Sequence, residues 1–136
     1  KGSKAIISDS FITHDPQAEN QTFIECLNET KVFYDGDLVF DDKYFVRGVD
    51  YLQRNGSYSC VGSIYFFGID KAVVKQIEAK LTQISGCYFG CSVSEEYHIV
   101  VRVLAESATI LTEAMNTVWS CAREIVTGVS PEKRRK

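Results

Sequence analysis

The stretch KVFYDGDLVFDD, residues 31–42, holds four aspartates within eight positions, a density of carboxylates that could bind a metal ion. A calcium loop of the EF-hand type needs oxygen ligands at alternating positions, a glycine at the sixth position and a glutamate at the twelfth. Counted from Asp35, Asp37 fits the third position, but Val39 and Phe40 occupy the fifth and sixth. This calcium loop is therefore excluded, and a metal-dependent enzyme built on these carboxylates stays only as an alternative.

The same stretch has the pattern of a β-hairpin. Asp35-Gly36 stands between two runs of β-branched, aliphatic and aromatic residues, 32–34 and 38–40. A type I′ turn requires positive φ at both central residues, and Asp-Gly is a favoured pair for it. We therefore expect Asp35 to be a turn residue and the other aspartates to lie in solvent beside the strands, where charge discourages pairing with foreign strand edges.

The histidines and cysteines form no recognisable catalytic or metal-binding motif in the sequence. His14 is expected in a loop and His98 at the start of a strand, and neither has a carboxylate or cysteine placed in sequence to form a triad. The close pair Cys87 and Cys91 lacks a CxxC or HxxxH partner. The motifs GxGxxG, GxxxxGK[ST], GxSxG and HExxH are absent from the sequence as well. We infer that the chain is no enzyme and that it has no metal site and no stably bound cofactor.

The five cysteines are an odd set that cannot all pair, so we expect buried free thiols. They are Cys26, Cys60, Cys87, Cys91 and Cys121.

Composition narrows the class of protein further. The chain has 136 residues, 45% of them hydrophobic, which suits a single domain with one core. The net charge of −3 gives no electrostatic reason to expect nucleic acid, and the basic cluster 133–136 is typical of a solvated tail. No run approaches the eighteen or so apolar residues of a membrane span, so we expect a soluble chain without a membrane partner.

The elements that must position these residues are strands in the first half of the chain. Turn residues separate the predicted strands 4–8, 21–27, 31–34 and 38–40, the last with a continuation over 44–47. Loops are predicted at 14–16 and 53–57. A run of small, β-branched and aromatic residues, 58–68, then predicts a largely buried strand.

Two helices and two strands are predicted in the second half. Asp70 is expected to cap a helix that runs to about residue 85, with Gly86 as its stop. Strands 88–93 and 98–104 follow, joined by a turn at 94–96. Ser107 is expected to cap the second helix, which ends at Gly128 and Pro131. Its predicted apolar stripe is Leu111, Met115, Val118, Ala122 and Ile125. The class is therefore α+β, with both helices packed against a sheet.

Four segments, in this order, resemble the C-terminal half of the urease accessory protein D family, called H in some bacteria. The first is the hairpin Asp35-Gly36-x-Leu38-Val39 with its later Asp42, and the second is the glycine-x-tyrosine segment 56–63. The third is the strand 99–104 with the later pair Trp119 and Arg123, and the fourth is the end 128–136. The similarity spans about residues 23–136, so we expect the single domain 1–136 to be the C-terminal part of a longer urease-accessory-type chain.

The resemblance implies a cytoplasmic scaffold for urease maturation that is not itself an enzyme. Family members join the accessory proteins F and G, the latter a GTPase, dock on apo-urease and assist the delivery of nickel to its active site. Nickel would then pass in transit rather than bind stably. The implied fold is a stacked, β-helix-like structure with two packed helices. The terminal helix is our hypothesised partner-binding region, because Trp119 and Arg123 are residue types that dominate interface hot spots.

A secreted or cell-surface glycosylated recognition domain without catalytic activity is the alternative. Three N-x-S/T triplets, at Asn20, Asn28 and Asn55, favour it. The first residue, Lys1, is no translation start and Met115 is the one methionine, so a fragment that has lost a signal peptide would fit.

Overall fold

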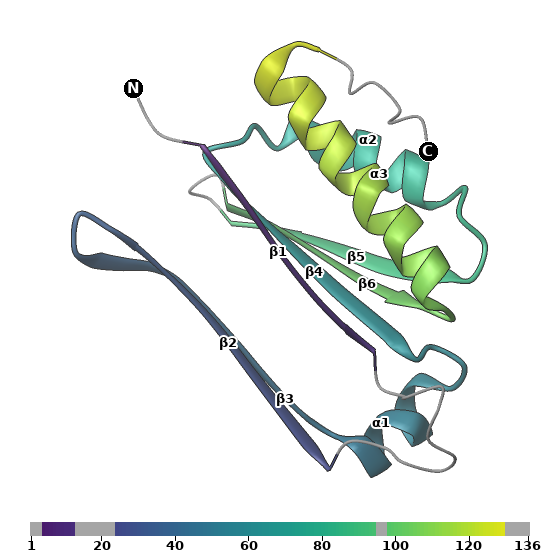
Figure 1. Cartoon of the computed structure of the whole chain (residues 1–136). Coiled ribbons are helices and arrows are strands. Elements are labelled where there is room, and N and C mark those ends of the chain that lie inside the picture. Colours follow the sequence, from purple (N-terminus) through teal and green to yellow (C-terminus); the bar gives the residue numbers. More distant parts are fainter. Residues whose placement is uncertain (1–3, 13–23, 95–97, 130–136) are drawn as a thin grey trace. The chain divides into compact units, whose positions relative to one another are not determined.

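The computed structural model describes residues 4–12, 24–94 and 98–129, without the side chains of residues 49 and 52 (Figure 1). The described residues form two compact units. One unit contains residues 4–12 and 58–129, and the other contains residues 24–57. The expectation of a single domain that is the C-terminal part of a longer chain stays a prediction.

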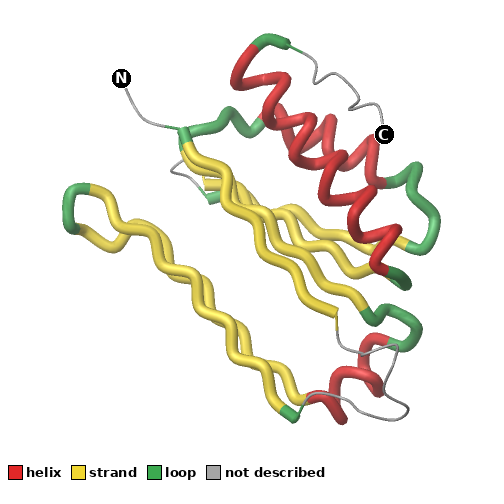
Figure 2. The backbone as a smooth tube through the Cα atoms, in the orientation of Figure 1, coloured by secondary structure: helices red, strands yellow, loops and turns green. Residues whose placement is uncertain are grey.

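The larger unit is a four-stranded antiparallel sheet with two helices on one face (Figures 1 and 2). Its strands lie in the order β1-β4-β6-β5. They are β1 (Ala5–Ile12), β4 (Cys60–Phe67), β5 (Cys87–Val93) and β6 (His98–Ala105), and the helices are α2 (Ala72–Leu81) and α3 (Ala108–Thr127). The segments predicted as 4–8, 58–68, 88–93 and 98–104 are confirmed as strands, with shifted ends.

The core lies between the helices and the sheet. Strand β6 alternates, so that Ile99, Val101 and Val103 are fully buried while the residues between them are half-buried. All eight residues of β4 are buried, which confirms the prediction for this run. On the helix side of the core, α2 contributes Val73, Ile77 and Leu81, which have the four-residue spacing of one helix face.

The helix ends follow the predicted signals. An Asp70 carboxylate oxygen accepts the N–H of Ala72 at 2.8 Å, and the hydroxyl of Ser107 accepts the N–H of Ile110 at 3.3 Å. Gly128 takes φ 69° and donates its N–H to the carbonyl of Glu124 at 2.8 Å, which is the expected left-handed end of α3. Pro131, the second stop signal, lies outside the described residues.

Two details of the predicted helices are wrong. The helix α2 ends at Leu81 rather than near residue 85, because the chain continues in turns up to Gly86. In α3, Ile125 is 37% exposed, whereas Ala114 and Cys121 are buried. These two small residues belong to the hydrophobic core, so the buried face of α3 is wider than the stripe of large residues suggested.

The smaller unit is a long hairpin followed by a short helix. Its elements are β2 (Glu25–Tyr34), β3 (Asp37–Arg47) and α1 (Gly48–Asn55). Asp35 has φ 51° and Gly36 has φ 92°, so the type I′ turn with Asp35 as a turn residue is confirmed. The register shifts between Val32 and Phe33, which leaves Val39 as a bulge in β3.

The smaller unit also corrects two predictions. Segments 21–27 and 31–34 were expected as separate strands, but residues 25–34 form one strand, since Asn28 and Thr30 pair across the ladder with Tyr44 and Asp42. Cross-strand pairing satisfies the backbone there, and the polar side chains are no obstacle to it. The predicted loop 53–57 begins inside α1, a third helix that the sequence pattern did not indicate.

The α+β class is confirmed by this mixture of antiparallel strands and helices. All five cysteines are free, as expected. Only Cys60 and Cys121 are buried, however, and the other three are half-buried. In the described part of the chain, no helix has the length and apolar character needed to cross a membrane.

Candidate partner-binding surface

The predicted contact residues lie together on the outer side of α3. The buried side of this helix faces the sheet through Leu111, Ala114, Val118, Cys121 and Ala122. Trp119 and Arg123, four residues apart, therefore share a side that the sheet does not cover. Trp119 is 42% exposed, and the guanidinium carbon of Arg123 lies 5.2 Å from the centre of its ring. This is a cation–π pair, which keeps an apolar face and a charge at fixed positions on the surface.

Close packing against β4 positions this helix. Gly62 of β4 lies under α3, where a Cβ atom would stand 2.5 Å from the sulfur of Met115 and 3.0 Å from a methyl carbon of Leu111. Glycine at this position lets the helix approach the strand without displacing these side chains. The cap at Ser107 fixes the start of the same helix. Trp119 and Arg123 are thus carried on a rigid element, which favours a preformed contact surface.

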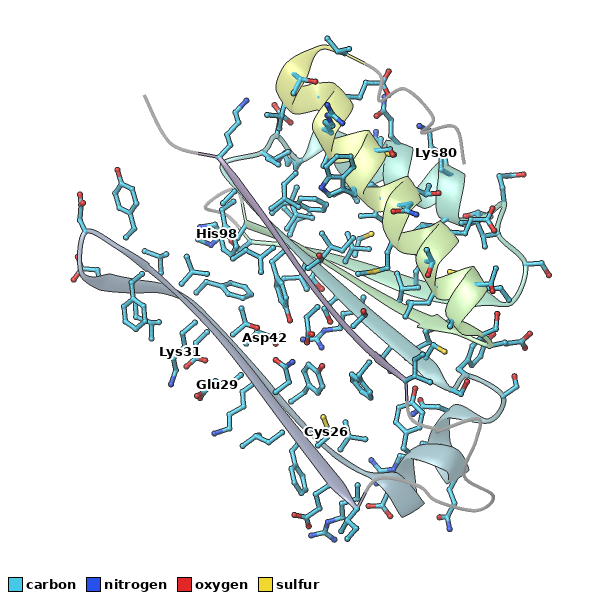
Figure 3. All side chains as sticks on the ribbon, in the orientation of Figure 1. Cys26, Glu29, Lys31, Asp42, Lys80 and His98 are labelled. Atoms are coloured by element: carbon cyan, nitrogen blue, oxygen red, sulfur yellow. The ribbon has the colours of Figure 1, made fainter. Side chains whose placement is uncertain are left out.

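A shallow groove lies between α2 and α3. It is lined by Lys80 of α2 and by polar residues of α3, namely Glu113, Asn116, Thr117 and Ser120 (Lys80 is labelled in Figure 3). The groove is open to solvent, so it suits polar contacts with a macromolecule better than enclosure of a small substrate.

The aspartates of the opening motif do not converge. Asp35 occupies the turn, whereas Asp37 and Asp41 are exposed along β3. Within the described ranges 4–12, 24–94 and 98–129, no group of three or more histidine, cysteine, aspartate or glutamate side chains is placed to hold a metal ion. The alternative of a metal-dependent enzyme at this hairpin therefore gains no support.

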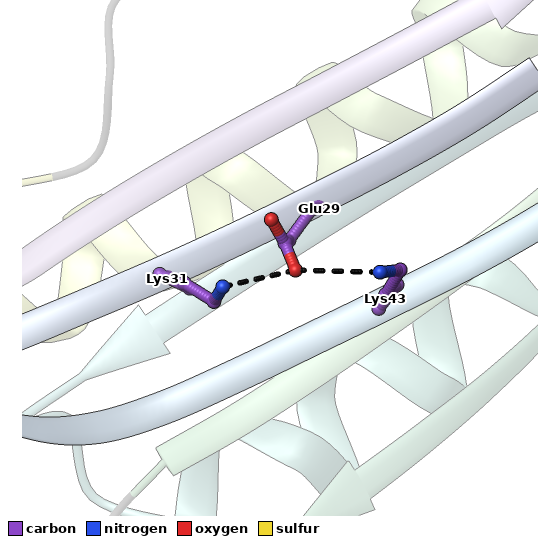
Figure 4. Close-up of polar contacts among 3 residues, drawn as sticks. All are labelled: Glu29, Lys31 and Lys43. Atoms are coloured by element: carbon purple, nitrogen blue, oxygen red, sulfur yellow. Dashed lines mark ion pairs between the residues drawn. The ribbon is translucent and has the colours of Figure 1, made fainter.

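Instead, the hairpin carries a ladder of ion pairs centred on Glu29 (Figure 4). Its carboxylate lies 3.0 Å from the ammonium of Lys31 and 3.7 Å from that of Lys43. The hydrogen bond and charge of Lys31 lower the pKa of Glu29, and Glu29 in turn raises the pKa of Lys31. The carboxylate of Glu25 lies 4.0 Å from Arg47 further along the same ribbon. These pairs are solvent-exposed, so each contributes little to stability.

Cys87, Cys91 and His98 lie in partly buried surroundings and pack against other residues. Burial, and secondarily the charge of Glu78, raise the pKa of Cys91 to about 11, and burial also raises that of Cys87. Thiols of this kind are poor nucleophiles at neutral pH. His98 opens β6 as predicted and packs edge-on against Phe67, with ring centres 5.2 Å apart. His14 lies outside the described residues.

Tertiary structure also creates a polar row that the sequence pattern did not indicate. The registers place Asp9 of β1 opposite Ser63 of β4, and Ser63 opposite Arg102 of β6. Ser63 is only 1% exposed, and among the described residues its hydroxyl has no hydrogen-bond partner. The one available signal was a serine inside the apolar run 60–67, which register alone connects with the two charges.

Comparison with known proteins connects these features to a family. The model of the family described as "UreD urease accessory protein" matches residues 1–136. A protein named urease accessory protein UreD 1, from Pseudomonas syringae pv. syringae (strain B728a), is 23% identical over 144 residues, which cover 99% of this chain and 50% of the relative. Its namesake from Bradyrhizobium sp. (strain BTAi1 / ATCC BAA-1182) is 24% identical over 133 residues, which cover 96% of this chain and 48% of the relative.

The chain thus spans about half the length of these curated relatives. The match extends over both compact units, from the hairpin with its Asp35-Gly36 turn to the helix that carries Trp119 and Arg123. The resemblance noted in the order of sequence motifs is confirmed by this match. The chain belongs to the UreD urease accessory protein family.

Proposed function

We propose that the chain acts as a scaffold in urease maturation, binding the accessory proteins F and G and apo-urease and assisting the delivery of nickel to the urease active site. The observation that carries this proposal is the family match over residues 1–136. Nickel is the cargo of this process and passes in transit. The chain is proposed to be a non-catalytic chaperone of the cytoplasm, where the apo-urease would be its client.

The geometry of α3 supports a binding role. Trp119 and Arg123 are exposed, held against each other, and carried on a helix that is anchored to the core. Aromatic and arginine side chains contribute most to interface energies when they are prepositioned and can be desolvated by a partner. We propose this pair as the contact point for accessory protein F.

The two β-structures support the proposed architecture. The hairpin β2–β3 and the four-stranded sheet are two separate antiparallel sheets, one in each compact unit. We propose that they belong to a stacked, β-helix-like arrangement in a longer chain, of which this sequence is the C-terminal part. The proposal accounts for the chain matching only about half the length of its relatives.

Co-purification of the chain with accessory protein F tests the contact point. Trp119→Ala and Arg123→Ala are each expected to weaken the complex at least about tenfold, the lower range for interface hot spots. Tyr88→Ala is the matched control, since Tyr88 is 64% exposed on β5, away from α3. Undiminished co-elution of both α3 variants would refute the assignment of the contact point, though not the accessory role.

The accessory role itself is tested by urease activation. Cells that carry the urease subunits and the other accessory proteins should produce nickel-loaded, active urease only when this chain, within its full-length protein, is present. Equal nickel content and activity in its absence would refute the role.

The alternative of a glycosylated recognition domain gains no support from the comparisons. Asn28 lies in the middle of β2 and is half-buried, and Asn55 ends α1. Asn20 lies outside the described residues.

A further inference from the structure

One face of the β2–β3 hairpin is exposed over its whole length and is ordered in a regular pattern. We call it the ladder face, and it consists of five cross-strand pairs: Glu25–Arg47, Leu27–Phe45, Glu29–Lys43, Lys31–Asp41 and Phe33–Leu38. Its four large apolar side chains are 50–60% exposed. The opposite face of the ribbon, which begins with Cys26 and Val46, is half-buried. The ladder face thus leaves apolar surface in water.

An exposed apolar ribbon of this kind needs a cover. A two-stranded hairpin is at best marginally stable by itself, and contiguous exposed apolar side chains mark interaction sites more often than plain surface. The ion pairs of Glu29 with Lys31 and Lys43 lie between the apolar side chains of this face (Figure 4). The face therefore presents an ordered pattern to its occupant.

The pattern of charge identifies the occupant. Each cross-strand pair contains either two opposite charges or two apolar side chains. In the centre, Glu29 and Lys31 on β2 stand beside Lys43 and Asp41 on β3, so the signs form a two-by-two checkerboard with no net charge. A partner of uniform charge would be repelled by half of the groups that it meets.

A second copy of the same face matches this pattern. Rotation by 180° about an axis along the strands lays β2 of one copy over β3 of the other, and each cross-strand pair then meets the same pair of its partner. Glutamate meets lysine or arginine, lysine meets aspartate, and apolar meets apolar. An isologous interface requires this self-complementarity. We propose that the ladder face is a self-association surface, on which two copies of the chain stack hairpin on hairpin.

The size of the face predicts a weak complex. Nine residues of β2 span about 30 Å and two strands about 10 Å, so the interface would bury about 600 Å² in total. This is below the usual range of stable interfaces, so a transient, concentration-dependent dimer is expected. The inference does not depend on the proposed accessory role.

The test inverts all four charges of the checkerboard. The variant E29K/K31E/D41K/K43E keeps every opposite-charge neighbour within the hairpin and leaves the net charge of the four positions unchanged. It should associate with itself as the wild type does. In a mixed dimer, however, every facing pair among these positions carries like charges, so the mixed dimer should be at least about tenfold weaker than either homodimer.

Sedimentation at about 5 to 500 µM measures the homodimers, and native mass spectrometry of variant mixed with isotope-labelled wild type measures the mixed dimer. L27S/F45S should weaken self-association at least about tenfold. Tyr88→Ser, which truncates an equally exposed aromatic residue outside the ladder face, should leave it unchanged. A wild type that stays monomeric throughout this range would overturn the proposal, and so would a statistical yield of mixed dimers. In the first case the face serves another molecule.

Discussion

The close approach of Met115 to Gly62 predicts that the effect of Gly62→Ala on the free energy of unfolding depends on the side chain at position 115. In Gly62→Ala, the new methyl group would stand 2.5 Å from the sulfur of Met115 and 3.0 Å from a methyl carbon of Leu111. Overpacking of this kind costs about 1–3 kcal/mol of the free energy of unfolding, and about 1.5 kcal/mol is expected because the methionine sulfur is near the end of a flexible side chain. The backbone of Gly62 has no positive φ, so alanine is otherwise compatible with this strand position.

The same substitution carries an opposing gain. Alanine reduces the conformational freedom of the unfolded chain relative to glycine, which stabilises the folded state by about 0.4–1 kcal/mol at a compatible site. We therefore expect Gly62→Ala to lower the free energy of unfolding by about 1 kcal/mol in the wild-type background. In the Met115→Ala background the main clash is gone, and the same change should be neutral or stabilising by about 0.5 kcal/mol.

Urea denaturation measures both values. The fluorescence of Trp119, the one tryptophan, reports on α3 directly, and the dependence of the free energy on denaturant should stay unchanged. The coupling energy of the double-mutant cycle should be about 1–1.5 kcal/mol. If the two substitutions add within about 0.3 kcal/mol, then the close approach of α3 to Gly62 does not position this helix and the reasoning is refuted.

Three further predictions concern single groups. Ser63→Ala should raise the free energy of unfolding by about 1 kcal/mol, because it removes a buried hydroxyl without a partner among the described residues. A loss of stability would show that the hydroxyl is hydrogen-bonded. Ser92→Ala, at an exposed serine, is the control. Cys91, with its pKa raised from the ordinary 9.0 to about 11, should react with iodoacetamide at pH 8 about 100-fold more slowly in the folded chain than in urea. Because the folded state binds the thiol proton more tightly than the unfolded state, the stability that Cys91 contributes is present below pH 9 and is lost as pH rises toward 11. Equal alkylation rates with and without urea would contradict the burial of this thiol. Ser107→Ala should lower the free energy of unfolding by about 1 kcal/mol, measured by thermal or urea unfolding. Ser107→Asp, which can still accept the N–H of Ile110, should be nearly neutral. An equal loss in both variants would show that the helix cap is not the cause of the lost stability.

The sequence alone determined the features that depend on neighbouring residues. The Asp35-Gly36 turn, the caps at Asp70 and Ser107, the end at Gly128 and the buried run of β4 follow from local backbone preference or from local hydrophobic pattern. The order of short motifs also sufficed to indicate the family. These signals act over a few residues, so they can be recognised before the fold is known.

Tertiary structure decided which segments meet. The strand order β1-β4-β6-β5 pairs segments that are distant in the sequence, and that pairing alone connects Asp9 with Ser63 and Ser63 with Arg102. Pairing with β3 likewise made β2 one continuous strand, where polar residues had predicted a break. The physical reason is that register and packing are chosen by the whole set of surfaces that must be buried together, and no local window contains that information.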